Sequence, residues 1–174
     1  QSDDTQYKGA ASELHKYGAI EDGTILWTNA LFSGMPTYAI AKPNGGAIIK
    51  YLRFPVNPRI WSQLFLYVLC SFILLLSFNV RPWLALAGAI GIGFATENLT
   101  ILMVGHNTKA AAIGYLPLVI AGCQYLFRNK KLLGFTLLTV GMSLEIYVNH
   151  VQITYYGGFL IAIFFIFKLA QHIK

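Results

Sequence analysis

Two glutamates stand inside long apolar runs, and their position demands a chemical explanation. Of the seven acidic residues in this chain of 174 residues, five lie within the first 22 positions, whereas Glu97 and Glu145 do not. An ionisable side chain inside an apolar span normally faces the protein interior or a wet cavity and marks a functional site. We therefore expect both carboxyl groups to face the inside of a helical bundle. A structural hydrogen bond to a neighbouring helix is the alternative.

Two short polar strings with similar composition follow these glutamates. Gly-His-Asn-Thr-Lys occupies 105–109, and Asn-His-Val-Gln occupies 149–152. Their His-Asn pairs can donate hydrogen bonds to anionic oxygens and the lysine adds a positive charge, so the set suits a phosphate or pyrophosphate. Helix capping or simple solvation is the alternative for each histidine. The candidate ligand-binding residues of these strings are His106, Asn107, Lys109, Asn149 and His150.

Spacing links one glutamate to the second string. Glu145, Asn149, Gln152 and Tyr156 follow one another at intervals of four, three and four residues. A helix continued through the linker would align them as a polar stripe on one side. If the helix instead breaks at Asn149, only Glu145 and Asn149 stay aligned. The two histidines and two glutamates match no known zinc-ligand spacing, so no metal ligands are predicted, and a divalent metal is left open as a cofactor.

Composition restricts the class of protein. The chain is 56% hydrophobic and only 11% charged, against roughly 25% charged residues in an ordinary soluble domain. Its 13 Lys and Arg are scattered between apolar stretches and form no basic stripe of the kind that nucleic acid requires, so no nucleic-acid partner is predicted. Cys70 and Cys123 stand apart from each other and from every histidine, which indicates neither a disulfide framework nor a zinc site.

The second part of the chain has the pattern of a multi-pass membrane protein. Residues 1–59 are rich in Gly, Pro and Asn and predict a long loop with short surface helices. Beyond them, each apolar stretch approaches the roughly 20 residues that a helix needs to cross a bilayer. We expect an all-α integral membrane protein, a polytopic helical bundle over 60–174. The five predicted spans are 60–78, 83–104, 110–127, 132–148 and 153–170.

Basic residues in the linkers predict the orientation of this bundle. One set of alternate linkers, with the C-terminal end, holds Arg81, Arg128, Lys130, Lys131, Lys168 and Lys174, whereas the opposite set holds only Lys109. Because the basic side of short linkers is cytoplasmic, the C-terminal end is predicted to be cytoplasmic and residues 1–59 extracytoplasmic. Both His-Asn strings then lie on the outer face.

Several local strings resemble one family. They are Asp-Asp-Thr-Gln-Tyr-Lys-Gly at 3–9, Leu-Trp-Thr-Asn at 26–29, Phe-Ser-Gly-Met-Pro-Thr-Tyr at 32–38, the string at 105–109, and Asn-His-Val-Gln-Ile-Thr-Tyr-Tyr at 149–156. With these strings, which span nearly the whole chain, the sequence resembles the bacterial YfhO-like membrane proteins in the form common among Bacteroidetes. Those proteins are grouped with the polyprenyl-phosphate-dependent glycosyltransferases of the GT-C fold.

The resemblance implies a reaction and its participants. It implies transfer of a sugar from a lipid-linked donor to a cell-envelope acceptor, outside the bacterial cytoplasmic (inner) membrane. It makes Asp3 the catalytic base, with Asp4 close behind, and places Tyr155 and Tyr156 in the substrate-binding set. The implied partners are the lipid-linked sugar, membrane lipids and the remainder of a longer polypeptide, since family members are longer than this chain.

A transporter or a non-enzymatic membrane scaffold is the competing interpretation. Buried Glu97 and Glu145 would then bind a proton or another ion. A transporter site is expected near the bilayer midplane, between broken helices. The polar strings of this sequence instead concentrate at one predicted surface, which favours the glycosyltransferase.

Overall fold

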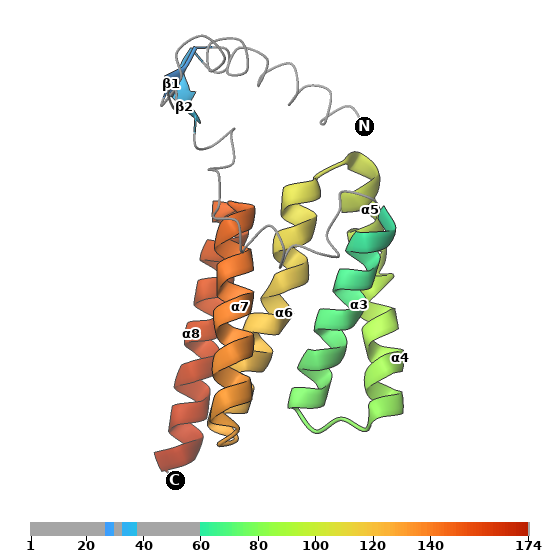
Figure 1. Cartoon of the computed structure of the whole chain (residues 1–174), viewed down its shortest axis with the longest axis vertical. Helices are drawn as coiled ribbons and strands as arrows, with labels where there is room; N and C mark the ends of the chain where they lie inside the picture. Colours follow the sequence, from blue (N-terminus) through green and yellow to red (C-terminus); the bar gives the residue numbers. More distant parts are fainter. Residues whose placement is uncertain (1–26, 30–32, 38–59, 174) are drawn as a thin grey trace.

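The computed structural model describes residues 27–29, 33–37 and 60–173 and shows a bundle of helices (Figure 1). Its helices are α3 (Ile60–Ser77), α4 (Pro82–Gly93), α5 (Thr96–Val104), α6 (Asn107–Phe127), α7 (Lys131–Val148) and α8 (Val151–Ile173). An antiparallel pair, β1 (Trp27–Thr28) with β2 (Met35–Pro36), is the other regular structure in the described ranges. Asp3 and Asp4 lie outside those ranges.

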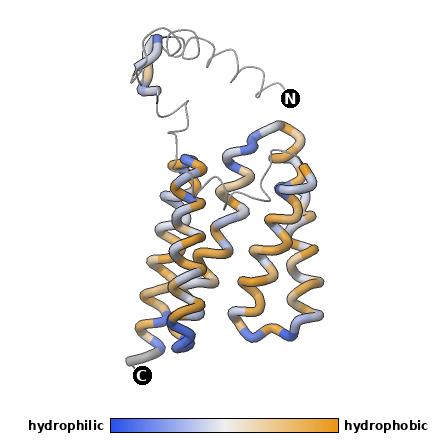
Figure 2. Tube along the Cα trace, viewed as in Figure 1, coloured by the Kyte–Doolittle hydropathy of each residue, from blue (hydrophilic) through white to orange (hydrophobic). Residues whose placement is uncertain are grey.

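The helices have the length and composition of membrane spans. α3, α6, α7 and α8 are each long and apolar enough to cross a bilayer, and α4 with α5 forms a bent pair that passes the same test together. Hydrophobic residues dominate the middle of the bundle, and hydrophilic ones gather at the turns between helices (Figure 2). The prediction of an all-α bundle is confirmed for the described residues, and the predicted number of five spans is reached if the bent pair counts as one span.

The prediction of one continuous helix over 83–104 is wrong. α4 ends at Gly93, α5 begins at Thr96, and the two helices bend by 43° at the break. Ala95 has an extended backbone (φ −56°, ψ 139°), which a helix cannot contain. The sequence before the break carries Gly88, Gly91 and Gly93, and each glycine inside a helix costs roughly 0.5–1 kcal/mol relative to alanine. This stretch is therefore the weakest point of the apolar run.

Helix α6 is the centre of the bundle. It packs mainly against α7 and α3 and more lightly against α8 and α5. Its span is 67% buried, whereas that of α8 is 6% buried, so α8 lies at the periphery. The largest buried cluster joins α3, α6 and α7 through residues that include Leu66, Tyr115 and Leu144.

Small residues bring α6 and α7 into backbone contact. A Cβ atom added at Gly122 would lie 2.5 Å from the Leu138 amide nitrogen, and one added at Gly134 would lie 2.7 Å from the Leu126 amide nitrogen. Gly141 approaches the backbone of Val119 in the same way. Membrane helices associate by close packing rather than by hydrophobic exclusion, and small residues permit that approach.

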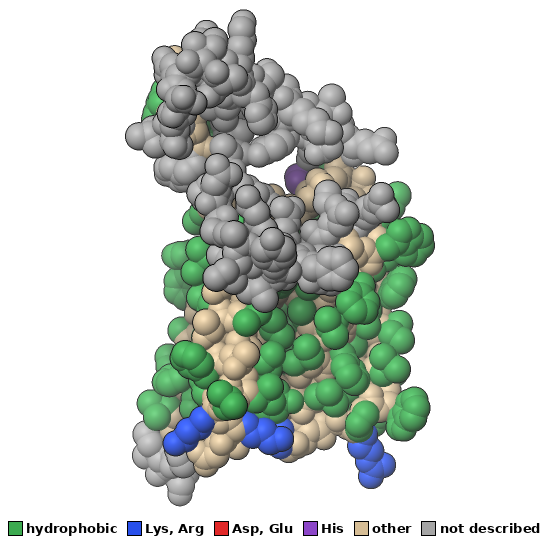
Figure 3. Space-filling view, in the orientation of Figure 1, with side chains coloured by type: hydrophobic (Ala, Val, Ile, Leu, Met, Phe, Trp, Pro, Cys, Tyr) green, Lys and Arg blue, Asp and Glu red, His purple; other side chains and the backbone are tan. Residues whose placement is uncertain are grey.

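Basic side chains gather at one end of the bundle, at the bottom of Figure 3. Arg128 ties the helices together there, because its guanidinium donates to the Ser77 carbonyl oxygen (2.8 Å) at the end of α3 and to the Asn79 side chain. A histidine side chain is visible toward the opposite end of the same view. The two ends thus differ in charge as the linker sequences predict.

Candidate functional site at the His-Asn end of the bundle

Two turns of the same construction lie at the end of the bundle away from Arg128. Gly105 ends α5 and Asn149 ends α7, each with a left-handed backbone (φ 94° and 56°). Glycine and asparagine are the residues that adopt this conformation most readily. A histidine follows each of them, and the next helix starts directly after it, at Asn107 and Val151. The linkers are therefore shorter than expected, and Lys109 belongs to the first turn of α6.

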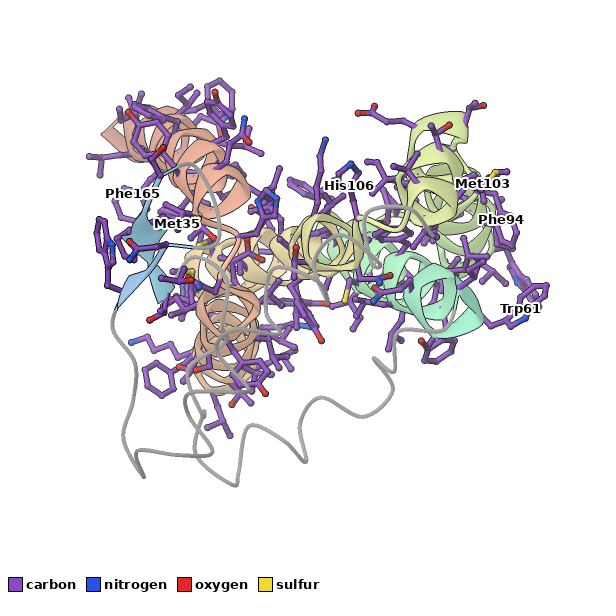
Figure 4. The ribbon with its side chains drawn as sticks, turned by 90° about the horizontal axis from the view of Figure 1, so that it is seen from above. Met35, Trp61, Phe94, Met103, His106 and Phe165 are labelled. Carbon is purple, nitrogen blue, oxygen red and sulfur yellow. The ribbon has the colours of Figure 1, made fainter. Side chains whose placement is uncertain are left out.

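Apolar packing brings the two turns together. Val148 and Ile153, which flank the second turn, pack into the same apolar cluster as Ala111 and Ala112 of the first turns of α6. His106 lies at the top of α6, between the α3–α5 group on one side and α7 with α8 on the other (Figure 4). Trp61, Phe94 and Met103 lie at the periphery in this view (Figure 4).

The imidazole of His150 is the best-defined polar group of the site. Burial lowers the pKa of His150, and the positive charges of Lys109 and His106 lower it further, whereas a backbone hydrogen bond acts in the opposite direction. His106, Lys109 and His150 are therefore close enough to influence one another electrostatically. The sequence predicted this convergence from two strings separated by about forty residues.

His150 also caps α8. Its Nδ1 accepts a hydrogen bond from the Ile153 amide (3.4 Å), and its carbonyl oxygen accepts bonds from the amides of Ile153 (3.0 Å) and Thr154 (3.1 Å). A bond from the capping side chain to the third helical amide satisfies one of the donors that a helix N-terminus leaves open. The functional interpretation and the capping interpretation of this histidine are thus both compatible with the geometry.

Glu145 lies beneath this turn, in the last turn of α7, and is only 1% exposed. Its Oε1 accepts a hydrogen bond from the Thr154 hydroxyl (3.2 Å), which lies equally close to the His150 carbonyl oxygen. Its Oε2 is buried without a hydrogen-bond partner. The expectation that Glu145 faces the interior is confirmed, and a buried carboxyl oxygen without a partner is energetically costly.

The same expectation for Glu97 is wrong, because its side chain is exposed. The break at Ala95 places Glu97 in the first turn of α5 rather than deep in a continuous span. A carboxylate in the first turn interacts favourably with the positive end of the helix dipole. This interaction accounts for an acidic residue at that position without a role in ligand binding.

The polar stripe of a helix continued through the second linker does not form. α7 stops at Val148, so the spacing from Glu145 onward is interrupted. Gln152 and Tyr156 are exposed, as is Tyr155, whose ring lies 5.8 Å from that of Tyr156 between centroids. Asn149 is retained as the residue that ends α7. The assignment of these residues to substrate binding stays a prediction.

Sequence reasoning missed three polar residues at this end of the molecule. Thr154 is the partner of Glu145. Gln63 and Tyr67 lie one turn apart near the start of α3, and the Gln63 Oε1 and the Tyr67 hydroxyl are buried without a partner. Their spacing of four residues inside an apolar span was the available signal. In the described part of the chain, no group of three or more His, Cys, Asp or Glu could hold a metal ion.

Comparison with known proteins gives no relative from which a role could be transferred. No protein-family model, curated protein or solved structure matches the chain.

Proposed function

We propose that the chain acts as a membrane glycosyltransferase that moves a sugar from a polyprenyl-phosphate carrier to a cell-envelope acceptor on the outer face of the bacterial cytoplasmic membrane. The observation that carries the proposal is the convergence of His106, Lys109 and His150 at one end of an apolar bundle. A lysine and two imidazoles can share the charge of a phosphate. The YfhO-like strings of the sequence support the same reaction and a GT-C-like architecture.

The position of the cluster fits a lipid-borne substrate. A polyprenyl chain would remain in the bilayer beside the bundle, and its phosphate would reach the end where α6 and α8 begin. Helix N-termini favour negative charge, since their open amides and the helix dipole both attract anions. With the basic end of the bundle in the cytoplasm, this cluster is extracytoplasmic.

Each residue then has a defined part in the transfer. Asp3, or Asp4, takes the proton of the acceptor hydroxyl as its oxygen attacks the anomeric carbon of the sugar. The bond from that carbon to the phosphate oxygen breaks, and polyprenyl phosphate leaves. Lys109 and the two histidines stabilise the negative charge that develops on the phosphate. Asp3 and Asp4 lie outside the described residues, so their role rests on the resemblance alone.

Reconstitution in lipid nanodiscs tests the proposal in two steps. The protein is expected to bind polyprenyl phosphate more tightly than polyprenol, which lacks the phosphate. It is also expected to release polyprenyl phosphate from at least one of a panel of polyprenyl-phosphate-linked hexoses and pentoses. Replacing Asp3 and Asp4 together with alanine should abolish release and leave binding intact. Equal affinity for polyprenol and polyprenyl phosphate, or release that is unaffected in the double variant, would overturn the proposal.

One observation favours a second candidate, a proton- or ion-binding membrane protein. The buried Oε2 of Glu145 lacks a hydrogen-bond partner, as expected for a carboxyl group that binds a proton or another ion. Because Glu97 is exposed, Glu145 is the acid on which this candidate rests. In sealed vesicles, ion or proton flux that Glu145→Gln abolishes and Lys109→Ala leaves unchanged would favour this candidate over the glycosyltransferase.

A further inference from the structure

We propose that a hydrogen-bonded frame of Ile153, Thr154 and Glu145 holds His150 as the neutral tautomer with its proton on Nε2. The Nε2–H is then the donor that His150 offers to the substrate phosphate. The second half of this proposal rests on the proposed function. The first half concerns the ligand-free protein and can be tested without any ligand.

The tautomer follows from what the Nδ1 atom contacts. The Ile153 amide N–H donates to the His150 carbonyl oxygen (3.0 Å) and also points at Nδ1 (N–Nδ1 3.4 Å), and this second branch favours a lone pair on Nδ1. In a neutral imidazole the proton then resides on Nε2. A protonated imidazolium would place a second N–H against the amide and lose this bond. The cap of α8 therefore selects one of the three forms of the ring.

The backbone that carries the ring is fixed by the neighbouring threonine. The Thr154 hydroxyl lies 3.2 Å from the His150 carbonyl oxygen and 3.2 Å from the Glu145 Oε1. One hydroxyl thus joins the last turn of α7, the first turn of α8 and the turn between them. Glu145 is buried and Thr154 is half-buried, so the contact is partly shielded from water. Glu145 and Thr154 are positioning residues, and they act on the phosphate only through His150.

The charged surroundings favour the same form. Two titratable groups act on His150 from the start of α6: Lys109 in its first turn and His106 just before it. Both disfavour a positive charge on the His150 ring. Burial disfavours that charge as well and is the largest contribution to the lowered pKa, whereas a hydrogen bond with the His150 backbone acts in the opposite direction. Glu145 approaches from α7, with the Thr154 hydroxyl between its carboxyl group and the His150 backbone. A neutral donor beside a lysine is suited to a phosphate, since the lysine supplies the charge and the imidazole supplies direction.

Nuclear magnetic resonance tests the frame in the ligand-free protein. The full chain is labelled with ¹⁵N-histidine in nanodiscs, and the signal lost in His150→Asn assigns the residue. At pH 7 the pattern of ring couplings should show a proton on Nε2 in the wild type and in Thr154→Ser, which keeps the hydroxyl. Thr154→Val should give a mixture of tautomers. Thr136→Val is the matched control, because Thr136 makes the same kind of bond to a carbonyl four residues back (2.9 Å) in α7.

Phosphate affinity tests the use of the donor. His150→Asn keeps an acceptor for the Ile153 amide but removes Nε2–H, and we expect roughly tenfold weaker binding of polyprenyl phosphate, as for loss of one hydrogen bond to a charged group. Inorganic phosphate, titrated in parallel, distinguishes free phosphate from the lipid-borne group. A proton on Nδ1, or unchanged affinity in His150→Asn, would overturn the inference. A proton on Nε2 without any binding of polyprenyl phosphate would instead count against the proposed function and leave the frame intact.

Discussion

The contact between α6 and α7 predicts the effect of adding a single methyl group at Gly122. In Gly122→Ala the new Cβ would lie 2.5 Å from the Leu138 nitrogen and 2.8 Å from its Cα, whereas ordinary van der Waals contact starts at 3.4 Å. The shortfall is about 0.9 Å, and the obstructing atoms belong to the backbone of a helix. Unlike the end of a flexible side chain, this backbone cannot rotate away, so the helices must move apart.

The cost of this displacement can be bounded. Overpacking a close contact typically costs about 1–3 kcal/mol, and the higher helix propensity of alanine offsets roughly 0.5–1 kcal/mol of it. Because backbone atoms obstruct the methyl group, we expect the upper part of the overpacking range and a net loss of about 1–2.5 kcal/mol in the free energy of unfolding, which raises the unfolding equilibrium constant by roughly 5- to 70-fold.

Reversible unfolding in mixed micelles, followed by steric trapping or by circular dichroism, measures this difference. Gly158→Ala is the matched control, because Gly158 lies in α8 with no heavy atom within 4 Å of an added Cβ. The control should be neutral or slightly stabilising. Wild-type stability in Gly122→Ala would refute the reasoning, and so would an equal loss in Gly158→Ala, since that loss could not come from the contact between α6 and α7.

Four further predictions concern charged and titratable residues. Lys109→Ala should weaken polyprenyl phosphate binding roughly tenfold at low salt, with a smaller difference at high salt because screening reduces the contribution of the charge; an equal difference at both salt concentrations would contradict this. Arg128→Ala should lower the free energy of unfolding by about 1–3 kcal/mol through loss of its charge-assisted hydrogen bonds, which a denaturation curve would detect. Glu97→Gln should change stability by less than about 0.5 kcal/mol and leave phosphate affinity unchanged in the same assays. The pKa of His150 is lowered on folding, so the unfolded chain binds the proton more readily than the folded protein does. The stability of the wild type should therefore fall as the pH drops below 6.5, the pKa of an unperturbed histidine. His150→Asn should lose that part of the pH dependence of stability.

The spans were predictable because bilayer thickness sets a length that the apolar runs must meet. The exception is 83–104. This stretch is apolar enough to cross a bilayer, but its backbone is not helical throughout. Hydropathy takes no account of backbone conformation, and Ala95 has an extended backbone between α4 and α5. The glycines at 88, 91 and 93 indicate that a helix is less stable in this stretch, but they do not specify at which residue the helix stops. The exposure of Glu97 follows from that single break.

Part of the site could be predicted from local sequence and part could not. His106, Lys109 and His150 were brought together correctly because antiparallel helices with short linkers must place alternate linkers at one end. The partner of Glu145 was missed because helical spacing stops applying at Asn149. A left-handed residue reverses the chain there, so Thr154, nine residues after Glu145 in sequence, meets it across the turn. Such a contact depends on the geometry of the turn rather than on any periodicity.

The alternatives of capping and ligand binding for the two histidines are complementary rather than exclusive. An imidazole has two nitrogens on opposite sides of the ring, and a cap uses only one of them. At His150 the cap occupies Nδ1, which fixes both the ring and the proton on the other nitrogen. His106 occupies the same position before α6 but makes no capping bond with its side chain. The two residues should therefore differ in function: His150 is the oriented donor, whereas the side chain of His106 takes no part in capping its helix.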